Sequence, residues 1–192
     1  MNPDERVRMA FAQQFKQIRK LRGFTQVALA QRLKINKAEI SRIENARRSP
    51  RFSRLVALAN ALEVALIVFF SDEHFIPPAQ TTLSKNNGLR PLPDRPSSTQ
   101  GFHKKFIPLK ITEEKQRFGR RLQKIRKQRK QVQVDIEVLS HVPSSDISRF
   151  ENGLGNIELN TIAILADALQ VPVSALFDYE GPLPDINGDR RI

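Results

Sequence analysis

The chain contains no cysteine, which excludes disulfide bonds and thiolate metal sites and suits a reducing cytosol. It also lacks a long hydrophobic segment. The longest apolar run, Val64–Phe70, is far shorter than the roughly 20 residues that cross a bilayer. The N-terminus shows no apolar core of a signal peptide. We therefore expect a cytoplasmic protein that does not contact a membrane.

Motifs for catalysis and metal binding are missing as well. His74, His103 and His141 are isolated in the sequence, and none begins a metal-ligand spacing. The sequence has neither a glycine-rich phosphate loop nor a nucleophile elbow. We therefore expect no enzymatic activity, no cofactor and no metal site.

Acidic residues are outnumbered, with 20 Asp and Glu against 32 Lys and Arg, for a formal charge of +12. An excess of this size suggests a polyanionic partner, most simply nucleic acid. A generically basic surface is the alternative, and charge alone does not decide between them. The hydrophobic content of 40% is ordinary for a globular protein.

One segment of the chain occurs twice. Phe11–Phe70 aligns without a gap on Phe118–Phe177, 107 positions later, with about 18 identities in 60 positions. Such a match indicates internal duplication. We predict two small domains, at residues 1–72 and 112–178. A proline-rich linker at 73–111 would join them, and a flexible tail would follow at 179–192.

The most informative stretch of each repeat is a helix, a turn and a second helix. In the first repeat this stretch is Gln26–Pro50, with apolar residues at helical spacing. Thr25 and Asn36 are suited to cap the two helices. The second helix directs Lys37, Glu39 and Arg42 outward, as expected of a helix that enters a DNA major groove.

The pattern FTQVALAQRL…ISRIEN…SP resembles the helix-turn-helix of the Cro/phage-repressor (XRE) family of transcription regulators from bacteria, phages and plasmids. The resemblance implies an all-α protein with two five-helix, lambda-repressor-like domains. The third helix of each domain would read bases in double-stranded operator DNA. By resemblance, its first, second, third and sixth residues contact the bases: Lys37, Ala38, Glu39 and Arg42, then Ser144, Ser145, Asp146 and Arg149.

Other positions are expected to contact the DNA backbone. These are Gln26 and Gln133 at the start of each second helix, together with Asn36, Asn45, Arg47, Arg48, Arg51 and Asn152. The alternative for Glu39 and Asp146, which we prefer, is a helix-start acid. For Arg42 and Arg149 the alternative is a solvated helix residue. The family also implies two internal ion pairs, Arg19 with Glu44 and Arg126 with Glu151.

The segment Val64–Phe70 allows two structures and two roles. Its β-branched and aromatic residues suit a strand, whereas its match to Val171–Phe177 favours a short helix. It either completes the core or, extended to residue 76, forms a self-association surface for a homodimer.

The two repeats differ in charge. Residues 1–72 hold 14 basic and six acidic residues, whereas 112–192 hold 12 of each. The loop Ala46–Ser49 corresponds to Gly153–Asn156, which has no basic residue. We therefore expect the first domain to dominate DNA binding by a transcriptional regulator, most simply a repressor. The second domain reads a weaker half-site or binds a protein partner, as an antitoxin would.

Overall fold

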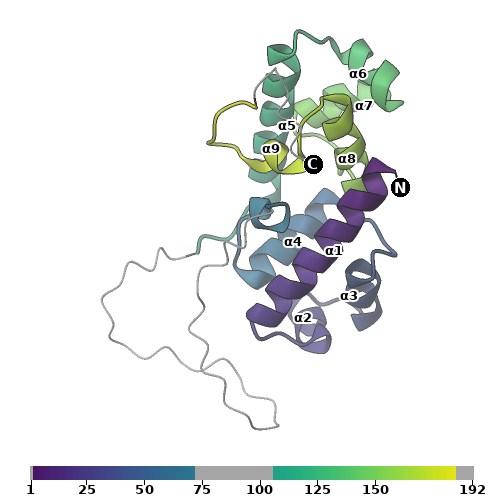
Figure 1. Cartoon of the computed structure of the whole chain (residues 1–192). Coiled ribbons are helices and arrows are strands. Elements are labelled where there is room, and N and C mark those ends of the chain that lie inside the picture. Colours follow the sequence, from purple (N-terminus) through teal and green to yellow (C-terminus); the bar gives the residue numbers. More distant parts are fainter. Residues whose placement is uncertain (1, 72–105, 185–192) are drawn as a thin grey trace.

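The computed structural model describes residues 2–71 and 106–184, which form helices joined by turns (Figure 1). The first repeat comprises α1 (Pro3–Leu21), α2 (Gln26–Arg32), α3 (Lys37–Glu44), α4 (Phe52–Leu62) and the 3₁₀ helix η1 (Leu66–Phe69). The second repeat comprises α5 (Ile111–Gln128), α6 (Gln133–Ser140), α7 (Ser144–Glu151), α8 (Leu159–Ala168) and α9 (Val173–Phe177). The predicted all-α fold is confirmed for these residues, and Val64–Phe70 contains a short helix, not a strand.

Local sequence signals account for several helix ends. Thr25 Oγ1 accepts a hydrogen bond from the Ala28 N–H (3.0 Å), and Asn36 Oδ1 accepts one from the Ala38 N–H (2.8 Å). Both predicted N-caps are therefore confirmed. Gly23 follows α1 at φ +73°, a conformation that favours glycine. Asn2, whose residue type also favours an N-cap, precedes α1 without a side-chain capping bond.

The predicted start of the second repeat also needs correction. The sequence suggests a helix capped by Thr112, but α5 begins at Ile111 and its N-cap residue is Lys110. The preceding chain is held by Asn60 of α4, which donates to the Leu109 carbonyl (2.9 Å) and accepts from its N–H (2.7 Å). Residues 106–110 of the predicted linker thus include an anchor to the first repeat, while residues 73–105 lie outside the described part.

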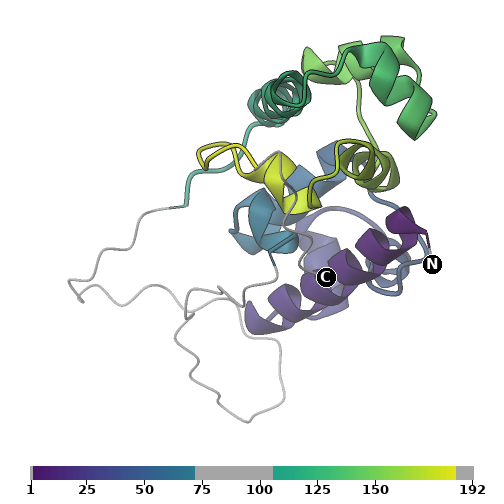
Figure 2. The same cartoon turned by 45° about the horizontal axis from the view of Figure 1, so that its top comes forward.

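The two repeats share one hydrophobic core. Phe11, Phe15 and Phe69 pack together in the first repeat, with ring centroids 5.4 to 6.2 Å apart. Across the boundary, α1 packs extensively against α8, and Phe52 at the start of α4 contacts Phe118 of α5 (5.3 Å). Figure 2 shows α8 of the second repeat (olive green) beside the N-terminal end of α1 (purple). The repeats are therefore not independent modules.

Contacts between the repeats are reciprocal. The Phe52 N–H donates to the Ile157 carbonyl (2.8 Å), and the Leu159 N–H donates to the Pro50 carbonyl (3.0 Å). These four residues are two pairs of positions 107 apart, and Arg51 and Glu158 form an antiparallel bridge between them. Ser49 and Asn156 likewise cap the opposite repeat, because each accepts from a backbone N–H there, at Asn160 (3.0 Å) and Ser53 (2.9 Å). Contacts of this kind define an approximate twofold axis.

Apolar residues complete the same axis. The equivalent residues Phe70 and Phe177 stack on each other, with centroids 4.5 Å apart and planes inclined by 9°. Leu66 and Phe69 are buried. The described part of the segment expected to mediate homodimerisation, 64–71, is thus used within the chain, and residues 72–76 lie outside the described part.

The region after α9 differs from its predicted flexibility. Tyr179–Pro184 packs against α5, where Arg121 donates to the carbonyls of Gly181 (2.9 Å) and Pro182 (2.6 Å). A glycine- and proline-rich composition indicated a mobile tail, but these hydrogen bonds hold the segment. Residues 185–192 lie outside the described part.

No helix in the described part of the chain is both long and apolar enough to span a membrane.

Candidate nucleic-acid interface

The third helix of the first repeat, α3, has one buried face and one exposed face. Ile40 and Ile43 are almost fully buried, which fixes the helix on the domain. Lys37, Ala38 and Arg42 are exposed on the other side. The structure therefore brings three of the four predicted base-reading residues onto one accessible surface.

The fourth residue, Glu39, has a partner within the domain. Its carboxylate pairs with Arg54 of α4 at 3.0 Å. This contact favours the structural alternative for Glu39 over acceptance from a cytosine amino group. In the second repeat, Asp146 lies 4.0 Å from Arg149 on the same helix, a looser and more exposed pair.

The ion pairs implied by the family resemblance are present in both repeats. Arg19 donates through Nε and Nη2 to the two carboxylate oxygens of Glu44, and both side chains are buried. Arg126 and Glu151 repeat this arrangement, with N–O distances of 2.6 and 2.9 Å. Each pair ties the first helix of its repeat to the end of the third helix. Removing one partner would leave a buried charge, at a cost of roughly 3–5 kcal/mol.

Protonation of the second pair is affected by its surroundings. Hydrogen bonding to Glu151 raises the pKa of Arg126. Burial opposes ionisation of Glu151, but hydrogen bonds from Arg126, Gln133 and Gln123 outweigh it, so that the pKa of Glu151 is lowered. Both groups are therefore held in their charged forms.

The glutamines at the first positions of α2 and α6 bond to the same two ion pairs. Gln26 Nε2 donates to Glu44 Oε2 (2.7 Å), and Gln133 Nε2 donates to Glu151 Oε2 (2.9 Å). Each amide is thereby oriented by the carboxylate at the end of the third helix of its repeat. One amide hydrogen remains in each case to donate elsewhere, because the side chain carries two.

The loop after α3 is basic and lies beside the axis between the repeats. Arg47 and Arg48 are exposed, and a hollow here is lined by these residues together with Arg51, Arg54 and Glu158. Arg51 pairs with Glu158 at 3.2 Å, so its charge is partly compensated. The Asn45 and Asn152 side chains donate to the carbonyls of Ser41 and Ser148, both at 2.8 Å, and cap the ends of α3 and α7.

The corresponding surface of the second repeat is less polar. Ser145 and Arg149 are exposed on α7, while Ser144 is half-buried and its N–H donates to Glu137 (3.1 Å). Hydrogen bonding by Ser144 lowers the pKa of Glu137. Apolar side chains stand where the first repeat has polar ones: Val138 (68% exposed), Leu139 (57%) and Leu154 (59%) correspond to Gln31, Arg32 and Arg47.

Sequence reasoning missed the residues that join the loops after α3 and α7. Ser49, Asn156 and Glu158 had no assigned role, and Arg51 was assigned to the DNA backbone alone. The 107-residue offset was an available signal, since Arg51 and Glu158 are equivalent positions of opposite charge.

The first repeat matches a known protein family. The family HTH_3, described as helix-turn-helix, matches residues 15–69. Residues 15–69 are an HTH_3 (XRE-type) domain. A crystal structure titled as an HTH_3 family transcriptional regulator from Vibrio cholerae is 33% identical over the matched region, with a TM-score of 0.33. The match covers 34% of this chain and 37% of that one. Among curated proteins, no match was found.

The HTH_3 domain contains α2, α3 and the basic loop that follows them, so the exposed cations described above lie within this domain. The presence of this domain supports the assignment of the chain as a DNA-binding regulator.

Proposed function

We propose that one chain binds one double-stranded DNA operator as a covalent pseudo-dimer and represses transcription by occluding a promoter. The reciprocal bridge of Arg51 and Glu158 carries this proposal, because it joins the loops that directly follow α3 and α7. In Figure 1, α3 and α7 lie at opposite ends of the molecule, both toward the right-hand side. Two helix-turn-helix units related by a twofold axis suit two half-sites on one face of the duplex.

Covalent linkage removes one cost of operator binding. Two separate chains would have to associate before or during binding, at the expense of translational and rotational freedom. Here the apolar contact of Phe70 with Phe177 lies within one chain. Binding should therefore involve one chain per duplex, without the concentration dependence of a dimerising repressor.

The first repeat should supply most of the affinity. Its recognition helix and loop expose Lys37, Arg42, Arg47 and Arg48, whereas the equivalent positions of the second repeat are Ser144, Arg149, Leu154 and Gly155. Phosphate contacts account for most of the salt-dependent affinity of DNA-binding proteins. The operator is accordingly expected to be asymmetric, with a strong half-site under the first repeat.

The test compares Arg42→Ala with Arg149→Ala on a site obtained by random-sequence selection, at one salt concentration. Arg42→Ala should cost about 1–3 kcal/mol and relax sequence choice, and Arg149→Ala should cost less. Light scattering of the complex should give one chain per duplex. Equal or larger loss from Arg149→Ala would contradict the asymmetry, two chains per site would contradict the pseudo-dimer, and failure to select any DNA would overturn the proposal.

A second candidate function is protein binding by the second repeat, as in an antitoxin. The exposed Val138, Leu139 and Leu154 favour it, since charged or polar side chains would suit a DNA-facing surface better. Under this alternative, Val138→Asp should leave operator affinity within about twofold, because no phosphate contact changes. A loss as large as that of Arg42→Ala would instead assign the α6 surface to DNA.

A further inference from the structure

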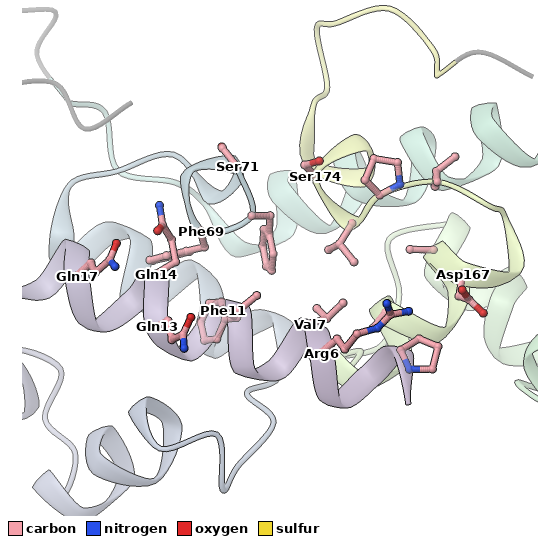
Figure 3. A pocket seen from close by; sticks show the side chains of 18 residues that line it. Arg6, Val7, Phe11, Gln13, Gln14, Gln17, Phe69, Ser71, Asp167 and Ser174 are labelled. Atoms are coloured by element: carbon pink, nitrogen blue, oxygen red, sulfur yellow. The ribbon is translucent and has the colours of Figure 1, made fainter. Parts of the chain in front are cut away.

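A cavity of about 590 Å³ lies between the two repeats. None of its lining residues belongs to α3 or α7. Figure 3 shows Val7 and Phe11 rising from α1, with Phe69 beside them and Ser174 of α9 across the space. Residues of α8 complete the wall. Small-molecule sites are commonly of this size and often lie where two domains meet.

The approximate twofold axis relates this cavity to a region that residues 179–184 partly fill. There, Arg121 donates to the carbonyls of Ala175 (2.9 Å), Gly181 (2.9 Å) and Pro182 (2.6 Å). The Tyr179 ring lies against Arg117, with 4.9 Å between the guanidinium carbon and the ring centroid. An aromatic ring and peptide carbonyls thus occupy the region equivalent to the cavity.

Side chains that hold this segment are absent from the first repeat. The positions of Arg117 and Arg121 are taken by Ala10 and Gln14, both of which line the cavity. Gln14 Nε2 donates to the Val68 carbonyl (3.3 Å), which is the counterpart of the bond from Arg121 to Ala175. Among the described residues, the two bonds to the tail carbonyls have no counterpart, and Ala10 and Gln14 are shorter than Arg117 and Arg121. Residues 72–75, which correspond to 179–182, lie outside the described part.

We infer that the cavity binds a small aromatic molecule that carries a hydrogen-bond acceptor such as a carbonyl. The ring would pack against Val7 and Ala10 of α1, over the buried rings of Phe11 and Phe69, as Tyr179 packs on α5. The second amide hydrogen of Gln14 would donate to the acceptor. Arg6 and Asp167 line the cavity with opposite charges, which favours a ligand without net charge.

Such a ligand would regulate the protein through the packing of the repeats. The cavity walls come from α1 and η1 on one side and from α8 and α9 on the other. Affinity therefore depends on how the repeats are placed, and a ligand that prefers one placement shifts the population toward it. Reciprocally, DNA that selects a placement would change the affinity for the ligand.

The probe is 4-hydroxyphenylacetamide, which combines the ring of Tyr179 with one amide carbonyl. Titration into the full ¹⁵N-labelled chain, without DNA, should cause saturable shifts in α1, η1, α8 and α9 and none in α2. p-Cresol, which lacks the carbonyl, should bind about fivefold more weakly, as expected for one lost hydrogen bond. Acetamide, which lacks the ring, should cause no saturable shift.

A matched pair of variants locates the site. Ala10 is exposed and lines the cavity, so Ala10→Phe should fill it and weaken probe binding at least about tenfold without removing core packing. Met9→Phe adds a ring at the neighbouring exposed position, outside the cavity, and should leave probe affinity unchanged. No saturable shift up to the solubility of the probe, or equal binding to both variants, would overturn the inference. Because DNA is absent, neither result bears on the proposed operator binding.

Discussion

Gly119 in α5 is the position at which one added methyl group tests the packing of the second repeat most directly. A Cβ atom there would lie 2.3 Å from the Phe150 carbonyl oxygen and 2.5 Å from that of Glu151. Both are backbone atoms at the end of α7, so no side-chain rotation relieves the contact. The equivalent residue of the first repeat is Ala12, which shows that a methyl group is compatible with this position in another packing.

The expected effect of Gly119→Ala is a balance of two terms. Alanine in a helix interior is more favourable than glycine by about 1 kcal/mol. Overpacking against fixed atoms costs about 1–3 kcal/mol, and here α5 must also move relative to the Arg126–Glu151 pair. We therefore expect a net destabilisation of about 1–2 kcal/mol.

The free energy of unfolding can be measured by denaturant titration with circular dichroism. Ala12→Gly is the matched control, and it should destabilise by about 1–2 kcal/mol through lost helix propensity and a lost buried methyl group. Opposite substitutions at equivalent positions should thus both lower stability. If Gly119→Ala were as stable as the wild type or more so, the close approach of α5 and α7 would be wrong.

Three further predictions concern the interface and the ionisable groups. Phe177→Ala should cost about 3–5 kcal/mol by denaturant unfolding, whereas Phe70→Ala should cost less because Phe70 is only partly buried. Because the pKa of Glu151 is lowered in the folded protein, its ionised carboxylate stabilises the fold at pH values above the unfolded-state pKa. This stabilisation is lost as the pH falls through the folded-state pKa. The free energy of unfolding of Glu151→Gln should therefore fall less on acidification than that of the wild type. Burial raises the pKa of Tyr179, the sole tyrosine. Absorbance near 295 nm should therefore show no phenolate around pH 10 while the protein is folded. The free energy of unfolding should fall as the pH rises further, because only the unfolded chain ionises.

Much of the first repeat could be predicted because its signals are local. Thr25 and Asn36 each accept a hydrogen bond from a backbone N–H two or three residues later, so the sequence contains the complete cap. The apolar residues of α3 recur at helical spacing, and Ile40 and Ile43 are buried accordingly. A helix end or a buried face of this kind depends on residues within about one or two turns.

The contacts between the repeats could not be predicted in the same way. The 107-residue period indicates two similar units but not that Pro50 and Ile157 would bond to each other's repeat. The apolar excess of Val64–Phe70 indicated a surface that needs a partner, yet composition does not distinguish a second chain from a second repeat. The tail was misjudged for a related reason, since its glycine and prolines suggest mobility unless a partner such as Arg121 is known.

The contacts of the basic residues in the second repeat change how the charge of that repeat should be interpreted. The sequence places nine basic residues between Lys115 and Lys130, but their number alone does not tell which of them are free to contact DNA. In the structure, Arg126 is buried with Glu151, Arg121 is buried against tail carbonyls, and Arg117 pairs with Glu114 and Glu180. Part of the charge on α5 therefore holds the fold together, and cannot at the same time neutralise phosphates. Cations of the first repeat are paired too, as Arg19, Arg32 and Arg54 show. The salt dependence of DNA binding should therefore arise mainly from the exposed cations of α3 and its loop, Lys37, Arg42, Arg47 and Arg48.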